Sequence, residues 1–345
     1  MTVSTGTVAA ALVRAAVMAG YAPSVHNTQP WLWTVLPDRL ELSAVRGRQL
    51  AATDPDGRLL VTSCGAALHH ARVALAAEGW DYRVDRLPDP GRPDLLAVVT
   101  PLGHAAAAPA AMRLVQAVRI RRSDRRPVTR ERVPVAHLRV IVESARAEGV
   151  GLHLLSGEQV YDLASAAHRA DAVESADERI QQELAYWTGQ LGGAAGGLGV
   201  PAASLPVVRP ATTVPNRDFG RAGELSAAGH DEAAVYGLLY GDGDEPGWWL
   251  RAGEALSAAW LTAIGLGVGV LPLSAVIEVP VTRAVLRRLV AELGWPYLVL
   301  RLGLADPDHA GPPAGTAPGG PARLDPSQVV DTSAVRHLLD DPPPN

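Results

Sequence analysis

Tyr21-Ala22-Pro23-Ser24-Val25-His26-Asn27-Thr28-Gln29-Pro30-Trp31 is the most specific pattern in this chain. It follows an alanine-rich segment that predicts a helix over residues 8–20 and precedes an apolar segment that predicts a strand over residues 31–36. The two prolines cannot sit inside a helix, and each restricts the residue before it. Between them lie short or flat side chains that donate and accept hydrogen bonds, so the pattern predicts a loop that binds a polar, planar group. The alternative is a helix-to-strand turn with no binding role.

A second pattern, Arg121-Arg122-Ser123-Asp124-Arg125, ends a helix predicted over residues 112–122. Three guanidiniums and a hydroxyl within five residues suit a dianion, because each planar guanidinium can pair with two phosphate oxygens. The alternatives are a solvated arginine face and an RNA-binding patch. No aromatic residues are interleaved with the run and the net charge is −5, which argues against nucleic acid as a partner.

Both patterns resemble one known family. Pro-Ser-x-His-Asn-Thr-Gln-Pro-Trp is similar to the flavin-contacting motif of the nitroreductase superfamily, and the form that includes His26 resembles its Acg-like, actinobacterial FMN-binding branch. Arg-Arg-Ser-x-Arg resembles the run that holds the FMN phosphate in that family. The resemblance spans roughly residues 12–330, and it implies FMN as cofactor with NAD(P)H as electron donor.

The resemblance also implies which residues bind the cofactor. The flavin ring would lie against the 21–31 loop and against backbone amides near residue 271, and the phosphate would meet the arginine run and a C-terminal arginine. Carried over onto this sequence, the cofactor-binding residues are Pro23, Ser24, His26, Asn27, Gln29, Arg121, Arg122, Ser123, Arg125, Leu271, Pro272, Leu273 and Arg323. No side-chain general acid is implied, so we predict no catalytic residue, and we predict no metal site.

An internal repeat points to two related halves. Gly65-Ala66-Ala67-Leu68 and Gly253-Glu254-Ala255-Leu256 each begin a long helix, and they are 253 − 65 = 188 residues apart. The first half has the 21–31 loop without an arginine run before it, and the second has the run without such a loop. We therefore predict a tandem-fused, pseudo-dimeric nitroreductase-like α+β fold, with antiparallel-rich sheets flanked by helices and one flavin site between the halves.

This organisation sets the predicted boundaries. The first half covers residues 1–108 and the second covers residues 109–345. A monomer is possible because the fused halves mimic the family dimer, and the sequence does not decide the oligomeric state. A lid-like insertion is expected at about residues 165–230, where Glu183, Trp187 and Arg217-Asp218-Phe219 resemble the Acg-like branch. The alternative is a surface elaboration without a role. A flexible link is predicted over residues 309–320.

Composition excludes several classes of protein. All 31 basic residues are arginine, so Schiff-base lysines and the lysine of phosphate-binding P-loops are excluded. Cys64 is the only cysteine, so there is no intrachain disulfide. Residues 255–277 carry no charge and are long enough for a membrane span, but their glycines and proline favour a buried core helix and no membrane contact. A cytoplasmic location is expected, because the N-terminus lacks a basic signal region.

Two functions remain open at this stage. The first is an FMN-dependent NAD(P)H oxidoreductase that passes hydride to a small organic acceptor. The second is an FMN-binding or storage protein whose lid occludes the site, with little reductase activity and no required substrate.

Overall fold

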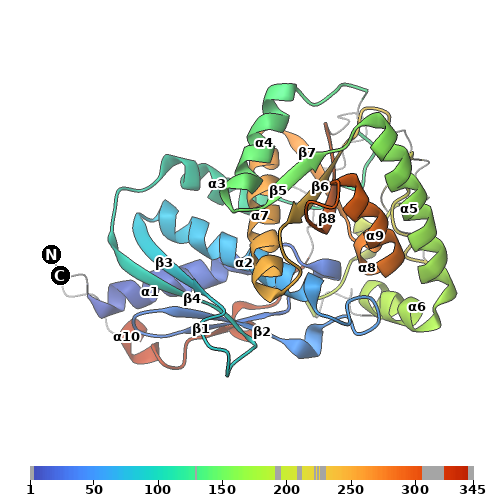
Figure 1. Cartoon of the computed structure of the whole chain (residues 1–345). Coiled ribbons are helices and arrows are strands. Elements are labelled where there is room, and N and C mark those ends of the chain that lie inside the picture. Colours follow the sequence, from blue (N-terminus) through green and yellow to red (C-terminus); the bar gives the residue numbers. More distant parts are fainter. Residues whose placement is uncertain are drawn as a thin grey trace.

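Two sheets enclose a central pair of long helices (Figure 1). The computed structural model describes residues 4–128, 130–190, 196–207, 212–220, 223, 225, 231–304 and 322–340. The link predicted at 309–320 and parts of the predicted insertion lie outside these residues.

The first sheet is built from the N-terminal part of the chain. Its elements are α1 (Thr5–Ala19), β1 (Trp31–Val35), β2 (Leu40–Ala44), α2 (Arg58–Ala77), β3 (Trp80–Arg86) and β4 (Leu95–His104). The strands lie in the order β3-β4-β2-β1 with antiparallel pairing throughout. β9 (Val330–Asp331) pairs in parallel with the free edge of β1. The C-terminal segment is thereby fastened beside the strand that follows the 21–31 loop.

The second sheet is built from the later part of the chain, reached through α3 (Pro109–Ile120). Its elements are α4 (Val135–Ala147), β5 (Gly151–Leu154), β6 (Val235–Gly241), α7 (Pro246–Gly265), β7 (Val268–Leu273) and β8 (Trp295–Leu304). The strand order is β5-β6-β8-β7, and every pair is antiparallel.

The two sheets have the same arrangement. Read from its other edge, the second sheet runs β7-β8-β6-β5, which matches β3-β4-β2-β1 strand for strand. α1 precedes β1 as α4 precedes β5, and α2 joins β2 to β3 as α7 joins β6 to β7. α2 and α7 are both 20 residues long. The α+β class with antiparallel-rich sheets is therefore confirmed.

α2 and α7 touch through equivalent glycines. A Cβ at Gly65 would collide with the carbonyl oxygen of Leu250, and a Cβ at Gly253 would collide with that of Thr62. Leu250 and Thr62 are 250 − 62 = 188 residues apart, the spacing of the two glycines. Each helix thus offers its partner the same backbone, as across a twofold axis, and only glycine lets the backbones come this close.

The outer face of the second sheet is covered by helices that have no counterpart on the first sheet in the described part of the chain. α5 (Gly157–Ala176), α8 (Ala275–Glu278) and α9 (Pro280–Leu289) bury their apolar side chains against β6, β7 and β8. A capping box of Ser156 and Gln159 starts α5. Asp177 ends it and caps α6 (Glu178–Ala185). The Asp177 cap therefore divides this part of the chain into two helices.

Among the described helices, α2 is long and apolar enough to cross a membrane. However, 89% of its apolar window is buried inside the protein. α7, which contains residues 255–265 of the uncharged 255–277 segment, is buried in the same core. Both helices belong to the hydrophobic core.

Candidate functional site

The 21–31 loop has an unusual backbone. His26, Asn27 and Gln29 adopt left-handed conformations, with φ of 46°, 56° and 45°. Residues other than glycine rarely adopt these angles, and such strain concentrates at functional sites. The Ser24 hydroxyl accepts a hydrogen bond from the Gln29 amide at 2.9 Å, and the Val25 amide donates to Ser63 of α2 at 3.2 Å. These bonds pin the strained loop to the central helices.

The amide side chains of the loop tie three parts of the chain together. Asn27 Nδ2 donates to three backbone carbonyl oxygens at 3.2, 3.1 and 3.0 Å, which belong to Gly197, Gly199 and Ala322. Gln29 Nε2 donates to the Gly197 oxygen at 2.6 Å, and its Oε1 accepts from the Leu324 amide at 3.1 Å. The loop therefore contacts both the insertion and the C-terminal segment.

Two arginines from distant parts of the sequence converge on this loop. Arg121, which follows α3, donates to the Tyr21 carbonyl oxygen at 3.3 Å, and Arg323 donates to the same oxygen at 3.2 Å. Arg323 also donates to Asn27 Oδ1 at 2.7 Å. We call the set Arg121, Arg323, Tyr21, Asn27 and Trp260 the Arg121 site.

Arg121 is a buried cation without a carboxylate. Only 6% of Arg121 is exposed to solvent, and its guanidinium lies 4.5 Å from the centre of the Trp260 ring. Among the described residues no acidic side chain lies within ion-pair distance of it, and its Nε has no hydrogen-bond partner. Burial lowers the pKa of Arg121 well below its ordinary value, and the nearby charge of Arg323 adds to this. Burial lowers the pKa of Arg323 to about 10. An anion would relieve both effects.

A second group surrounds His26. Arg217 donates to His26 Nε2 at 2.7 Å, and it pairs with Glu174 of α5 at 2.8 Å and with Glu278 of α8 at 2.6 Å. We call these four residues the Arg217 cluster. Phe219 lies edge-on to the imidazole, with ring centres 5.9 Å apart. The cluster anchors the insertion to the 21–31 loop.

Arg125 reaches the insertion and not Arg121. It donates weakly to the Ser204 carbonyl oxygen at 3.4 Å, and its guanidinium lies 5.6 Å from the Phe219 ring centre. Burial lowers the pKa of Arg125 to about 10, and Arg301 adds to the effect. Arg125 thus stands beside the Arg217 cluster.

The remaining predicted residues are placed differently. Arg122 and Ser123 make no hydrogen bond to either group in the described part of the chain, although Arg122 helps to lower the pKa of Asp124. The Asp124 amide donates to the Val270 carbonyl oxygen at 2.9 Å, so the arginine run lies along the free edge of β7. Leu271, Pro272 and Leu273 pair with β8 on the other side of that strand, and Pro272 has no N–H. Pro23 is buried at the start of the loop.

A second buried arginine cluster occupies the position related by the internal repeat. Arg72, which is 188 residues before Trp260, pairs with Glu148 at 2.6 Å and with Glu254 at 2.7 Å. Arg86 donates to both oxygens of Glu254 at 2.8 and 2.9 Å. We call Arg72, Arg86, Glu148 and Glu254 the Arg72 cluster. Every charge in it has an opposite partner.

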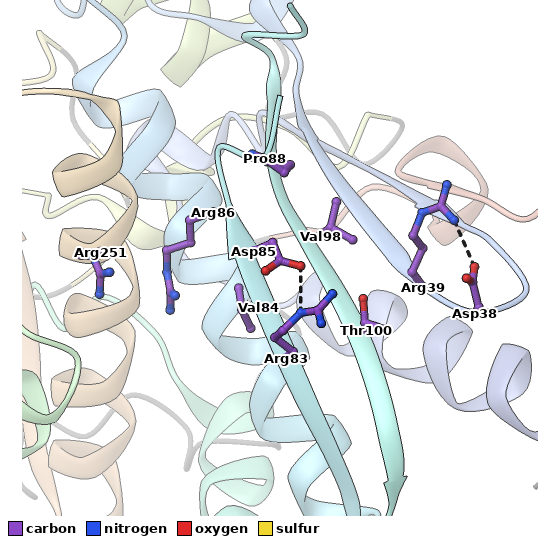
Figure 2. Close-up of a pocket in the computed structure, with 10 residues that line it drawn as sticks. All are labelled: Asp38, Arg39, Arg83, Val84, Asp85, Arg86, Pro88, Val98, Thr100 and Arg251. Atoms are coloured by element: carbon purple, nitrogen blue, oxygen red, sulfur yellow. Dashed lines mark hydrogen bonds and ion pairs between the residues drawn. The ribbon is translucent and has the colours of Figure 1, made fainter. Parts of the chain in front are cut away.

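An arginine-lined groove of about 820 Å³ lies on the outer side of the first sheet, over β3 and β4 (Figure 2). Its cations are mostly neutralised: Arg83 pairs with Asp85 at 3.0 Å, and Arg39 pairs with Asp38 at 3.1 Å. Both pairs are exposed and have the geometry of ordinary surface ion pairs. The groove does not share the features of the Arg121 site.

Sequence reasoning missed several residues of these groups. Trp260 was seen only as part of an apolar helix, and Glu174 and Glu278 had no pattern that separates them from other helix carboxylates. Arg217 was noted in a lid-like motif without its partner. The 188-residue spacing of the repeat could have singled out Trp260, because the equivalent residue of the first half is the charged Arg72.

Comparisons with known proteins agree with this description. No family model matches the chain. The chain is 38% identical over 317 residues to "Putative NAD(P)H nitroreductase Rv3131" of Mycobacterium tuberculosis, which covers 90% of this chain and 88% of that protein. It is 31% identical over 307 residues to "Putative NAD(P)H nitroreductase acg" of the same species, with 85% and 88% covered.

Solved structures resemble it more distantly. A nitroreductase with bound FMN from Bacteroides fragilis covers 61% of this chain and 98% of its own, at 15% identity and a TM-score of 0.36. The FMN- and NADPH-dependent nitroreductase NfnB from a Sphigopyxis strain covers 63% and 97%, at 16% identity and a TM-score of 0.39. On the strength of the two sequence relatives, the chain belongs to the nitroreductase superfamily, in its Acg-like branch.

Proposed function

We propose that this chain is an FMN-dependent oxidoreductase that transfers hydride from NAD(P)H to a small organic acceptor. The observation that carries the proposal is the Arg121 site, where the buried guanidinium of Arg121 lies beside that of Arg323 and pairs with no carboxylate of the described residues. A phosphate dianion supplies the missing charge and accepts several N–H bonds from planar forks. The names of the sequence relatives support NAD(P)H as the electron donor.

The residues of the site fit FMN. Arg121 and Arg323 would hold its phosphate, and Asn27 and Gln29 would face its ring system with amide donors and acceptors. Amide donors beside the ring stabilise negative charge on a reduced flavin. The chemistry that bound FMN supplies is hydride transfer, and the chain contributes binding, orientation and exclusion of water.

The test is FMN affinity, measured by quenching of flavin fluorescence on the purified chain. We expect tight binding by the native chain and a loss of about 100-fold in Arg121→Gln, because about 1.4 kcal/mol corresponds to each factor of ten and charged hydrogen bonds contribute about 1.5–3 kcal/mol. Arg119→Gln, an exposed arginine on the same helix, is the matched control and should bind as the native chain does. Equal affinity in both variants would remove the phosphate role of Arg121.

A second function has a specific observation in its favour. The insertion occupies donors of the 21–31 loop: the Gly197 oxygen accepts from both Asn27 and Gln29. Gly197 has φ of 68°, and a Cβ there would collide with the Arg323 carbonyl, so the insertion and the C-terminal segment meet tightly over the loop. Such a cover fits an FMN-storage protein with little turnover.

Stopped-flow mixing with NADPH and with NADH separates the two functions. Bleaching of the flavin absorbance at a rate that rises with donor concentration supports the oxidoreductase. No bleaching with either donor, in a protein that retains FMN, would support storage.

We also propose that residues 1–108 and 109–345 are fused copies of one ancestral unit, with a single FMN site between them. The matching strand orders and the reciprocal glycine contacts of α2 and α7 support this. A working monomer follows, because the equivalent of the family dimer interface lies inside one chain. A cytoplasmic location is part of the same proposal, and a chain that elutes as a stable dimer would count against the monomer.

A further inference from the structure

His26 stands apart from its neighbours in the 21–31 loop. Only 9% of His26 is exposed to solvent, and its backbone has a left-handed conformation. The proposed function uses the amides of the loop and does not require a titrating group. A histidine buried beside the proposed cofactor site needs a physical account, since its charge would change between about pH 5 and 8 if it behaved ordinarily.

The contact with Arg217 defines the protonation state of this ring. A guanidinium has only donors and stays protonated in proteins. The 2.7 Å contact between Arg217 Nη1 and His26 Nε2 is therefore an N–H donated to a lone pair. A neutral imidazole with an acceptor at Nε2 carries its proton at Nδ1.

The charges around His26 come from four segments. Arg217 belongs to the insertion, Glu174 to α5, Glu278 to α8 and Arg125 to the arginine run. The two carboxylates both bind Nη2 of Arg217, which leaves Nη1 directed at the histidine. Burial lowers the pKa of His26 well below its ordinary value, and Arg217 and then Arg125 lower it further.

Glu278 and Glu174 also keep Arg217 charged. Burial opposes the charged guanidinium, but Glu278 and Glu174, with Glu183 of α6 adding to them, outweigh it and raise the pKa of Arg217. Both carboxyl side chains are almost completely buried. The cluster is thus rigidly held from α5 and α8, and it presents one fixed donor to the strained loop.

We propose that Arg217 is a positioning residue that holds His26 neutral with its proton on Nδ1, so that the loop presents a fixed, uncharged hydrogen-bond donor beside the FMN site. The relevance of this histidine to the flavin rests on the proposed function, although the protonation state of His26 can be measured without cofactor. The consequence for the flavin is that its properties do not follow a histidine titration.

The test is ¹⁵N-histidine labelling and long-range ¹H–¹⁵N correlation of the full chain across about pH 5 to 8. His26→Asn assigns the signals. In the native chain we expect a His26 Nδ1 that carries a proton, an Nε2 that behaves as an acceptor, and no titration over that range. A His26 that titrates, or that carries its proton on Nε2, would overturn the proposal.

Variants give the second arm. In Arg217→Gln the donor charge is gone while Glu174 and Glu278 remain, so His26 should begin to titrate in the same range. Arg217→Lys keeps a positive charge and N–H donors on one nitrogen, and it should restore the non-titrating state at least in part. Arg179→Gln removes an exposed arginine, 85% accessible, on α6 and should change nothing. If Arg217→Gln does not fold, the Nδ1 proton and the absence of titration in the native chain still decide the proposal.

The flavin spectrum distinguishes this inference from the proposed function. In FMN-loaded protein, the reduction potential of Arg217→Gln should gain a pH-dependent step that the native chain lacks. If the native chain binds no FMN but His26 is still fixed, the proposed function fails and the tautomer assignment stands. If FMN binds and His26 titrates in the native chain, the inference fails and the function stands.

Discussion

The Arg121 site and the Arg72 cluster occupy positions related by the internal repeat, yet their charges are arranged in opposite ways. In the Arg121 site, a guanidinium lies on Trp260 beside a second guanidinium, without a carboxylate within ion-pair distance of Arg121 in the described residues. In the Arg72 cluster, an arginine stands at the place of Trp260, and Glu148 and Glu254 neutralise it. Glu148 follows α4, as the 21–31 loop follows α1.

The difference separates a structural use of buried arginine from a binding use. A buried cation is strongly disfavoured unless an opposite charge meets it. The Arg72 cluster contains its own opposite charges, so it leaves no net charge there for a ligand to neutralise. In the described part of the chain Arg121 meets no such opposite charge, and we propose that the phosphate of FMN supplies it.

The largest expected effect comes from Glu254→Gln. This residue is fully buried and binds both Arg72 and Arg86. The isosteric amide leaves two buried guanidiniums with Glu148 alone, so the free energy of unfolding should fall by about 3–5 kcal/mol. Urea unfolding measures it, and Glu143→Gln at an exposed pair is the control, with a change under about 0.5 kcal/mol. FMN affinity should stay within about twofold of native. An unfolding free energy equal to that of the native chain would mean that Glu254 is not needed to neutralise Arg72 and Arg86.

Gly65→Ala should destabilise the pair of central helices. The added methyl collides with the Leu250 carbonyl, and α7 cannot move without disturbing both halves. We expect a loss of about 3 kcal/mol, which thermal unfolding would detect. Gly157→Ala at the start of α5 meets nothing within 4 Å and should cost little. A tolerated methyl at Gly65 would argue against close backbone contact at the repeat axis.

Stability should fall in acid because histidines are buried uncharged. Burial lowers the pKa of His69 to about 4, from an ordinary 6.5, against the opposing charge of Glu148. The unfolded chain therefore binds more protons than the folded chain between these values, and stability decreases as pH falls through that window. For His69 alone the loss between pH 7 and 5 is about 2 kcal/mol.

His69→Asn isolates this contribution. Asparagine can keep the 2.8 Å contact with Ser257 without a titrating group, so urea midpoints should fall less steeply with pH than in the native chain. His70 and His26, whose pKa values burial also lowers, still contribute in both proteins. His168→Asn on the surface should leave the native slope unchanged. Identical slopes in His69→Asn and the native chain would refute the assignment.

The smallest effect is expected from Arg121→Met without cofactor. Removing a buried cation that faces Arg323 should raise the stability of the FMN-free chain by about 1 kcal/mol, the reverse of what Glu254→Gln does. The same variant should lose the stabilisation that added FMN gives the native chain. Calorimetry with and without FMN measures both, and a destabilised variant without FMN would mean that Arg121 is satisfied by the protein itself.

Local patterns predicted much of the fold and a set of cofactor-binding residues, of which the structure brings Asn27, Arg121 and Arg323 together. The 188-residue spacing predicted two equivalent helices, and α2 and α7 meet at the glycines that define this spacing. The prolines and side-chain amides of residues 21–31 predicted a constrained polar loop. These signals are local because they depend on backbone restriction and on repetition along the chain.

Long-range contacts could not be predicted in the same way. The Arg217 cluster includes a direct contact between residues 191 positions apart, His26 and Arg217. Its carboxylates, Glu174 and Glu278, have no distinctive neighbourhood in the sequence. The division of the arginine run is also tertiary. Arg121 turns to the Tyr21 carbonyl and Arg125 turns to the insertion, because Asp124 between them is bonded to β7.

The most direct test of the account is the number of FMN molecules bound per chain, counted by native mass spectrometry at saturating cofactor. The account predicts one FMN on a single chain, retained in Glu254→Gln and largely lost in Arg121→Met. Two FMN molecules per chain, or one that Arg121→Met retains fully, would contradict it.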